Sequence, residues 1–273
     1  MEHEQSRRLE KRRRKRCVIL IVIVVLIVIV IIAVVLGLTL RQNKMVLFQH
    51  FFICCFCIFR CTTDCQKVWD AFEQAYVNKD PCKVAVEAYD PLIVAAPFKP
   101  QCNRMIFWSK TKDVVHGFTE KRDCFVTLED TLLGSVLDGL TWCGKEGSKG
   151  TFTTGCPGWS KCKNNPVLSF WRRISAAFAD VACGNVTAML SGSIDTPFNS
   201  TSIFASIEVV RFQASRIKSL NVVMVLQSNC TDSSLNNLRQ SLDTGITYSC
   251  KDVHESRIQE CGAKPEIACG ACW

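Results

Sequence analysis

The stretch VVMVLQSNCTDSSLNNLRQSLDTGITYSC, residues 222–250, decides the fold class, because two apolar runs flank a helix-compatible segment. The runs are Val222–Leu226 and Ile246–Cys250, and the segment between them is Ser233–Leu242. A further run of β-branched and apolar residues, Ile203–Val210, precedes them. Short apolar strands that alternate with helices are typical of parallel sheets. We therefore predict an α/β fold with a small, mostly parallel sheet and covering helices.

The preceding part of the chain carries helix signals. Thr127-Leu128-Glu129-Asp130 resembles a capping box ahead of leucines and valines at helical spacing. Asn164-Asn165-Pro166 is a second start signal, since proline suits the first position of a helix. The helix that follows would bring these side chains to one face: Trp171, Ile174, Ser175, Phe178 and Ala182.

An uncharged run of valine, isoleucine and leucine, Val18–Leu40, stands near the start of the chain. As a helix it would span roughly 35 Å, enough to cross a hydrocarbon core. Eight basic residues lie just before it, whereas only three follow within twenty residues. This asymmetry predicts a cytoplasmic tail at 1–17, a transmembrane anchor at 18–40 and an extracellular C-terminal domain, a single-pass type II topology at the plasma membrane. A cleaved signal peptide is the alternative, but its apolar core is normally shorter and ends in a small-residue cleavage site.

Residues 41–60 fit neither the anchor nor the domain that follows. Met45–Phe59 is apolar and aromatic, contains three closely spaced cysteines and is interrupted by Gln49-His50. It is too short and too polar for a second span. Two interpretations stay open: a membrane-proximal interfacial stretch, or sequence foreign to the mature protein, such as a mistranslated exon boundary.

The net charge of +8 does not indicate a nucleic-acid partner. Residues 1–16 hold eight basic and three acidic groups, or +5, which leaves +3 for the rest of the chain. The basic cluster is explained by membrane topology, and aromatic residues are not interleaved with it. We therefore predict no nucleic-acid binding.

The cysteine content indicates an oxidising compartment. The chain has 18 cysteines, and the 14 from Cys61 onward form an even set that permits full disulfide pairing. Zinc is the rival use, but only Cys269-Gly-Ala-Cys272 has suitable spacing and no second pair or histidine cluster accompanies it, so we predict no metal. Three sequons agree with an extracellular surface and make Asn185, Asn199 and Asn229 candidate glycosylation sites.

The residues taken singly do not compel an active site. No Gly-x-Ser-x-Gly occurs and the four histidines form no motif, so a Ser-His-Asp enzyme is not supported. Glu208 interrupts the otherwise apolar string Ser206–Val210, where an unpaired buried charge would be costly. A carboxylate at a strand end that faces water or forms an ion pair would explain that pattern without any function.

Five strings of uncommon composition change this view. They are Asp64–Phe72 (DCQKVWDAF), Ile106–Ser109 (IFWS), Phe125–Gly134 (FVTLEDTLLG), Leu140–Gly144 (LTWCG), and Asn164–Val167 (NNPV) with Phe170-Trp171. In this order they closely resemble the ADP-ribosyl cyclase and cyclic ADP-ribose hydrolase family, and within it the vertebrate type II transmembrane NAD glycohydrolases. The likeness runs from about Cys61 to the C-terminus, and the predicted anchor agrees with it.

The resemblance implies a disulfide-rich, two-lobed ectodomain over residues 61–273. A helical lobe would comprise about 61–101 and 127–182, and an α/β lobe about 102–126 and 183–273, with the site in the cleft between them. By similarity Glu208 would be the catalytic carboxylate. Three further residues would be catalytic. Trp108 and Trp171 would flank the nicotinamide. Glu129 would bind the carboxamide and influence the share of cyclic product. The other substrate-binding residues would be Asp138, assisting at the nicotinamide end, and Ser109, Lys110, Ser175 and Phe204, near the phosphates and ribose.

The implied activity is an ecto-NAD glycohydrolase that gives ADP-ribose and some cyclic ADP-ribose, and that also hydrolyses cyclic ADP-ribose. NAD is then a substrate, and no cofactor or metal is required. A non-catalytic surface receptor or adhesion module on the same scaffold is the alternative, and a lectin-like ectodomain is a third reading that has no motif in its favour. A homodimer or a surface receptor partner would be compatible with either of the first two.

Two positions depart from the family pattern. Lys110 replaces an expected arginine, which keeps the charge but loses the bidentate fork for phosphate. Ile203 stands where the family usually has threonine, so one hydroxyl is absent unless Ser202 substitutes. An ideal helix would also set Glu129 and Asp138 about 180° apart. Both can face one substrate only if Glu129 lies at or before the first turn.

The resemblance also implies a disulfide framework. The bridges would be Cys82–Cys162, Cys102–Cys183, Cys143–Cys156, Cys230–Cys250, and Cys261 with Cys269 or Cys272. Cys124 has no expected partner in that framework, and the leftover C-terminal cysteine is available to it. The family's first bridge closes a longer loop than Cys61–Cys65 allows.

Overall fold

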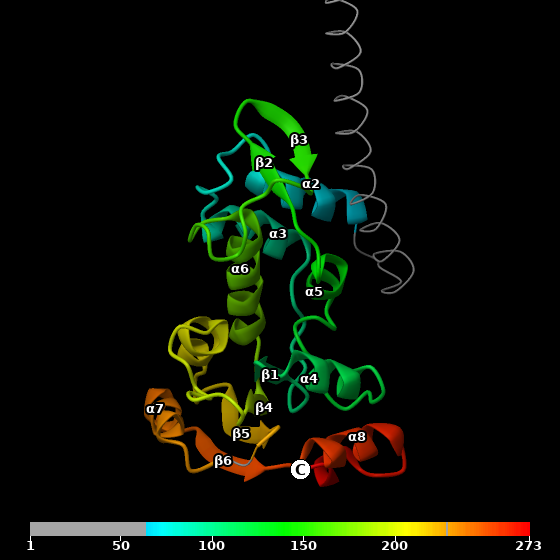
Figure 1. Cartoon of the computed structure of the whole chain (residues 1–273). Coiled ribbons are helices and arrows are strands. Elements are labelled where there is room, and N and C mark those ends of the chain that lie inside the picture. The colour runs from blue at the N-terminus through cyan, green and yellow to red at the C-terminus, as the bar shows by residue number, and fades with distance from the viewer. Residues whose placement is uncertain (1–63, 228) are drawn as a thin grey trace, which may run out of the picture.

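The computed structural model describes residues 64–227 and 229–273, and its main sheet has four parallel strands (Figure 1). The strand order is β1 (Ile106–Ser109), β4 (Gly184–Ser191), β5 (Ile217–Val225) and β6 (Thr247–Asp252). The predicted α/β fold with a parallel sheet is confirmed. The apolar runs at 222–226 and 246–250 overlap β5 and β6, and the predicted helix between them is α7 (Ser233–Ser241).

The remaining described elements are mostly helical. The helices are α2 (Cys65–Tyr76), α3 (Asp90–Ala95), α4 (Lys112–Thr119), α5 (Leu132–Leu137), α6 (Pro166–Asp180) and α8 (Glu255–Ala263), with short 3-10 or π turns η1 (Val86–Tyr89), η2 (Phe204–Glu208), η3 (Val209–Arg211) and η4 (Cys269–Ala271). An antiparallel hairpin joins β2 (Cys143–Lys145) to β3 (Ser148–Phe152). Figure 1 shows α2, α3 and the hairpin at one end of the molecule, the main sheet at the other, and α6 running between them.

Helices cover both faces of the main sheet. Phe107 and Leu190 belong to one core cluster together with residues of α6, η2 and α7, and Phe107 contacts Phe178 of α6 with ring centroids 5.3 Å apart. Ile106 and Met189 lie in a second cluster with residues of α4 and α8. Because a sheet covered on both faces buries successive residues, its central strands are apolar without alternation, as Val222–Val225 shows.

Helix α6 begins where the sequence predicts. Asn165 is its N-cap, and the side-chain Oδ1 accepts a 2.8 Å hydrogen bond from the backbone N–H of Leu168. Pro166 occupies the first helical position, where the missing N–H costs nothing. The buried Asn165 Nδ2 also donates to the carbonyl oxygens of Trp159 (3.1 Å) and Cys162 (2.9 Å). One side chain therefore fixes both the start of α6 and the loop before it.

The strand predicted at Ile203–Val210 is wrong, because this segment forms the consecutive turns η2 and η3. The Ser202 hydroxyl accepts from the backbone N–H of Ala205 at 3.1 Å and caps the first turn. The buried side chains are Phe204, Ala205, Glu208, Val209 and Phe212, which recur at helical rather than alternate spacing. Capping and burial period therefore outweigh the β-branched composition.

Five disulfides join pairs that the resemblance implies, and a sixth gives Cys124 the partner that the resemblance left open. The four earlier pairs are Cys82–Cys162, Cys102–Cys183, Cys143–Cys156 and Cys230–Cys250. Cys261 pairs with Cys272 rather than Cys269, and Cys269 pairs with Cys124. Cys65 is disulfide-bonded as well. Because Cys269 and Cys272 are oxidised, they do not act as thiolate ligands for zinc.

A buried arginine holds the C-terminal segment against the rest of the fold. The Arg122 guanidinium donates to the carbonyl oxygens of Cys261 (2.6 Å), Lys264 (2.8 Å) and Ile267 (2.5 Å). The ring of Trp273 packs against two others, with centroids 5.3 Å from Phe118 and 5.0 Å from Phe125. The last residues are therefore an integrated part of the fold.

Arg122→Leu is expected to lower the free energy of unfolding by about 2–3 kcal/mol, because three carbonyl groups lose a charged donor. Urea unfolding with the disulfides intact measures this change. Arg239→Leu is the matched control, since Arg239 is exposed and its replacement should change stability by less than about 0.5 kcal/mol. Equal stability of the two variants would contradict the role given to Arg122.

Several predictions concern parts of the chain outside the described residues. The tail at 1–17, the anchor at 18–40 and the segment at 41–60 lie there and stay predictions. From residue 64 onward, residue 228 excepted, no helix is long and apolar enough to span a bilayer. The division of residues 61–273 into two lobes also stays a prediction.

Candidate active site

A cleft of about 590 Å³ lies at the carboxyl end of β1. Its walls come from the end of β1, the turn before α5, helix α6 and the segment 199–208. Ligands of open α/β sheets bind outside the carboxyl ends of the strands, so this is the expected place for a site. The nine predicted catalytic and substrate-binding residues all line it: Trp108, Ser109, Lys110, Glu129, Asp138, Trp171, Ser175, Phe204 and Glu208.

Glu208 is the most perturbed acid of the cleft. Only 7% of the residue is exposed, and it ends the π turn η2. Burial raises the pKa of Glu208 from 4.5 to about 8, the Ser175 hydroxyl partly opposes this, and the charge of Glu129 adds to it. The interpretation of Glu208 as a carboxylate that faces water is therefore wrong. A buried, unpaired carboxyl group in a cleft is typical of an acid that takes part in chemistry.

Two indole rings line the same cleft. Trp108 follows the buried Phe107 on β1, so its side chain leaves the opposite face of the strand and is half-buried. Trp171 lies one turn before Ser175 on α6, and its ring packs against Phe170 with centroids 5.3 Å apart. Aromatic faces beside a carboxylate suit a flat, cationic ligand.

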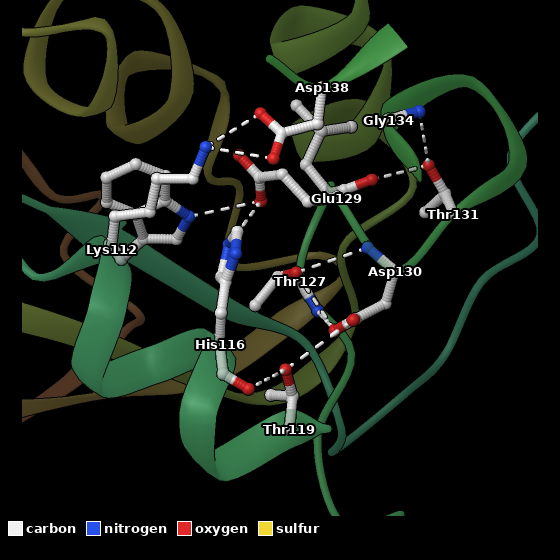
Figure 2. A network of polar contacts seen from close by, with 11 residues as sticks. Lys112, His116, Thr119, Thr127, Glu129, Asp130, Thr131, Gly134 and Asp138 are labelled. Atoms are coloured by element: carbon white, nitrogen blue, oxygen red, sulfur yellow. Dashed lines mark hydrogen bonds and ion pairs between the residues drawn. The ribbon is translucent and has the colours of Figure 1, made fainter. Parts of the chain in front are cut away.

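The turn that carries Glu129 explains how it shares the cleft with Asp138. Thr127 and Asp130 form the reciprocal bonds of a capping box, with Thr127 N–H donating to Asp130 Oδ2 (2.8 Å) and Asp130 N–H to Thr127 Oγ1 (3.2 Å) (Figure 2). The box closes a turn before the helix instead of starting it, because Thr131 is the N-cap of α5. Glu129 therefore precedes the first turn of α5, whereas Asp138 caps the C-terminus of that helix. This is the arrangement in which both acids can face one substrate.

A glycine allows this turn to lie against α5. A Cβ at Gly134 would meet the carbonyl oxygen of Leu128 at 2.1 Å and the Cα of Glu129 at 2.7 Å. No side chain fits at those distances, so the close approach of the turn depends on glycine.

Lys110 lies in a strained conformation at the mouth of the cleft. Its φ of 61° is in the left-handed region, directly between the end of β1 and the N-cap of α4, Thr111. A non-glycine residue there costs on the order of 1 kcal/mol, and such strain gathers at functional sites. The Lys110 side chain is exposed and lines the cleft, where its charge is available to an anionic ligand.

The structure places at the cleft two residues that sequence reasoning missed. Lys112 on α4 lines the cleft and donates to both carboxylate oxygens of Asp138, at 2.8 and 2.9 Å. His116, one turn later, lies beside Glu129 (Figure 2). Their spacing of four on a helix was a usable signal, since it places both on one face. The rim also contains Trp159, Arg172, Asn199, Thr201, Ser202 and Ile203.

The predicted glycosylation sites differ in their surroundings. Asn185 is exposed at the start of β4, Asn199 is exposed at the rim of the cleft, and Asn229 is half-buried. Whether they carry glycans stays a prediction. No three His, Cys, Asp or Glu side chains of residues 64–227 and 229–273 group as a metal site. The absence of a cofactor stays a prediction as well.

Comparison with known proteins agrees with this arrangement. A family described as ADP-ribosyl cyclase matches residues 51–270. Mouse ADP-ribosyl cyclase/cyclic ADP-ribose hydrolase 1 is 37% identical over 212 residues, which cover 74% of this chain and 70% of the mouse protein. A CD38 structure described as a covalent enzyme–substrate complex has a TM-score of 0.73 at 32% identity, covering 80% of this chain and 94% of its own. Porcine CD38 with the covalent intermediate ribo-F-ribose-5'-phosphate has a TM-score of 0.71 at 33% identity, covering 78% of this chain and 96% of its own. The chain therefore belongs to the ADP-ribosyl cyclase family.

Proposed function

We propose that this chain cleaves the nicotinamide–ribose bond of NAD, gives ADP-ribose and some cyclic ADP-ribose, and also hydrolyses cyclic ADP-ribose. The observation that carries the proposal is the buried Glu208 carboxyl group in a cleft that Trp108 and Trp171 also line. The name of the mouse relative states both activities, and the porcine relative was solved with a ribosyl covalent intermediate. Both support the same chemistry here.

The chemistry needs few groups. The nicotinamide nitrogen of NAD is already cationic, so the leaving group takes the bonding electrons without a general acid. An oxocarbenium-like ribose develops, and the Glu208 carboxylate stabilises it or bonds to C1′. Water then gives ADP-ribose and regenerates the carboxylate, whereas attack by an adenine nitrogen gives cyclic ADP-ribose. The indoles of Trp108 and Trp171 favour the pyridinium by roughly 1–2 kcal/mol when water is excluded.

The other lining residues supply binding. Glu129 would accept the carboxamide N–H of nicotinamide, and Asp138, held by Lys112, would assist at that end. The exposed charge of Lys110 and the rim Arg172 suit the pyrophosphate, since both are cations at the mouth of the cleft. Ser109, Ser175 and Phe204 would lie along the ribose. Ile203 lines the cleft without a hydroxyl, and the nearby Ser202 lines it as well, so Ser202 is the available substitute.

The activity would take place at the cell surface. The apolar run Val18–Leu40 and the basic residues before it support a type II anchor with the domain outside, and the disulfides support an oxidising compartment. A homodimer and a surface receptor partner remain predictions from the resemblance.

Product analysis tests the proposal. The chain is incubated with NAD, and nicotinamide, ADP-ribose and cyclic ADP-ribose are separated over time. We expect nicotinamide to appear in step with the sum of the other two, ADP-ribose in excess, and added cyclic ADP-ribose to be consumed. No nicotinamide above the spontaneous rate would contradict the proposal and favour the receptor alternative.

A further inference from the structure

Helix α4 presents two basic side chains, one turn apart, to two carboxylates of the cleft. Lys112 holds Asp138 at the end of α5, and His116 faces Glu129 in the turn before α5 (Figure 2). The first pair is bidentate, and in the second His116 Nε2 lies 3.4 Å from Glu129 Oε2. One helix face therefore fixes both acids at the nicotinamide end of the cleft.

The surroundings of His116 leave it little choice of partner. Its Nε2 is buried and has no hydrogen bond of good geometry, so Glu129 Oε2 is the acceptor within reach. That same oxygen accepts a 3.1 Å hydrogen bond from Trp108 Nε1. The imidazole also stands edge-on to the Trp108 ring, with centroids 5.7 Å apart and planes at 85°. His116, Glu129 and Trp108 therefore form one contiguous contact group.

The balance of charge favours a cationic imidazole. Burial lowers the pKa of His116, but the contact with Glu129 and its negative charge outweigh this, so the pKa is raised above 6.5. Lys112 on the same helix lowers the pKa of His116, and Asp130 raises it. Helix α8 packs on α4 through Val115 and Phe118, and β1 contributes the neutral Trp108. The position in the last turn of α4 also suits a cation.

We propose that His116 is a positioning residue that holds Glu129 and Trp108 in place for the nicotinamide carboxamide. His116 is not among the residues that line the cleft, so it acts through Glu129 rather than on substrate. This rests on the proposed function. Glu129 would bind the carboxamide alike in the ground state and the transition state. Loosening Glu129 therefore weakens NAD binding more than it slows the chemical step.

The test is the pH dependence of KM and kcat for NAD in the full chain and in His116→Gln. Glutamine fills similar space without charge. At pH 6 we expect KM to rise about five- to tenfold in the variant, the size of one charge-assisted contact, with kcat within about twofold. The parent KM should rise as pH passes through the raised pKa of His116, because the cation is lost there. The variant KM should show no such rise.

Three further variants separate positioning from mere support of the fold. His116→Lys restores a cation and should restore a low KM that stays constant through pH 8.5. Asp113→Asn alters an exposed residue of the same helix and should behave as the parent. Glu129→Gln should raise KM as His116→Gln does, and the double variant should add little, since both remove one interaction. If His116→Gln fails to fold, the parent KM profile and its loss in Glu129→Gln decide the question.

An unchanged KM in His116→Gln at every pH would overturn the proposal, as would a fall in kcat with KM unchanged. Failure of the parent to release nicotinamide from NAD would instead overturn the proposed function. The two failures are distinct, because the first requires a working parent enzyme.

Discussion

Glu208→Gln is expected to lower kcat for nicotinamide release by about 10³-fold or more, while the variant folds normally. Glutamine has the same shape and still reaches the Ser175 hydroxyl, but it carries no negative charge for the developing ribosyl cation and cannot bond to C1′. KM for NAD should change little, because the residue would act on the transition state. Steady-state nicotinamide release, with circular dichroism to confirm folding, measures both quantities.

The matched control is Glu120→Gln, which removes an acid from the exposed end of α4. It should retain the parental rate. A folded Glu208→Gln variant that releases nicotinamide at the parental rate would contradict the assignment. Equal losses in both variants would indicate a general effect of charge on the protein.

The parts of the fold that the sequence predicts well are those with local chemical signals. The start of α6 follows from an asparagine cap and a proline at the first position, and both act within four residues. Strand β5 follows from an apolar run that two covering layers require, whereas β6 is a mostly exposed edge strand whose Tyr248 and Cys250 pack on one core cluster. The cleft residues came from resemblance, since the one with an unusual local pattern, Glu208, was also explained by a carboxylate that faces water or forms an ion pair.

The wrong prediction and the features that were not predicted depend on competing local signals or on contacts between residues far apart in the sequence. Ile203–Val210 has the composition of a strand, but the Ser202 cap and the burial of Phe204 and Glu208 at a spacing of four make it helical. The contact between His116 and Glu129 joins residues 13 positions apart through tertiary packing, so periodicity alone does not reveal it. The high pKa of Glu208 likewise arises from burial in the folded protein, so the neighbouring sequence alone does not predict it.

Burial of Glu208 also affects the free energy of unfolding. The raised pKa of this carboxyl group decides whether stability rises or falls with pH. The folded pKa of about 8 exceeds the ordinary value of 4.5, so the unfolded chain releases this proton first as pH rises. Stability contributed by the neutral carboxyl group is therefore present below pH 4.5, falls between pH 4.5 and 8, and levels off above that range. The predicted active form of the residue is the ionised one, which the folded protein disfavours.

We therefore expect Glu208→Gln to gain stability over the parent as pH rises, by about 4 kcal/mol between pH 5 and pH 9. Urea unfolding of both proteins at pH 5, 7 and 9 measures the difference, and Glu120→Gln should show no comparable trend. Over the same range kcat of the parent for NAD should rise, because ionised Glu208 is the reacting form. A stability difference independent of pH would contradict the buried, high-pKa carboxyl group. A fall in stability together with a rise in activity as pH increases would identify Glu208 as the source of both changes. Active sites commonly have lower stability where activity requires it.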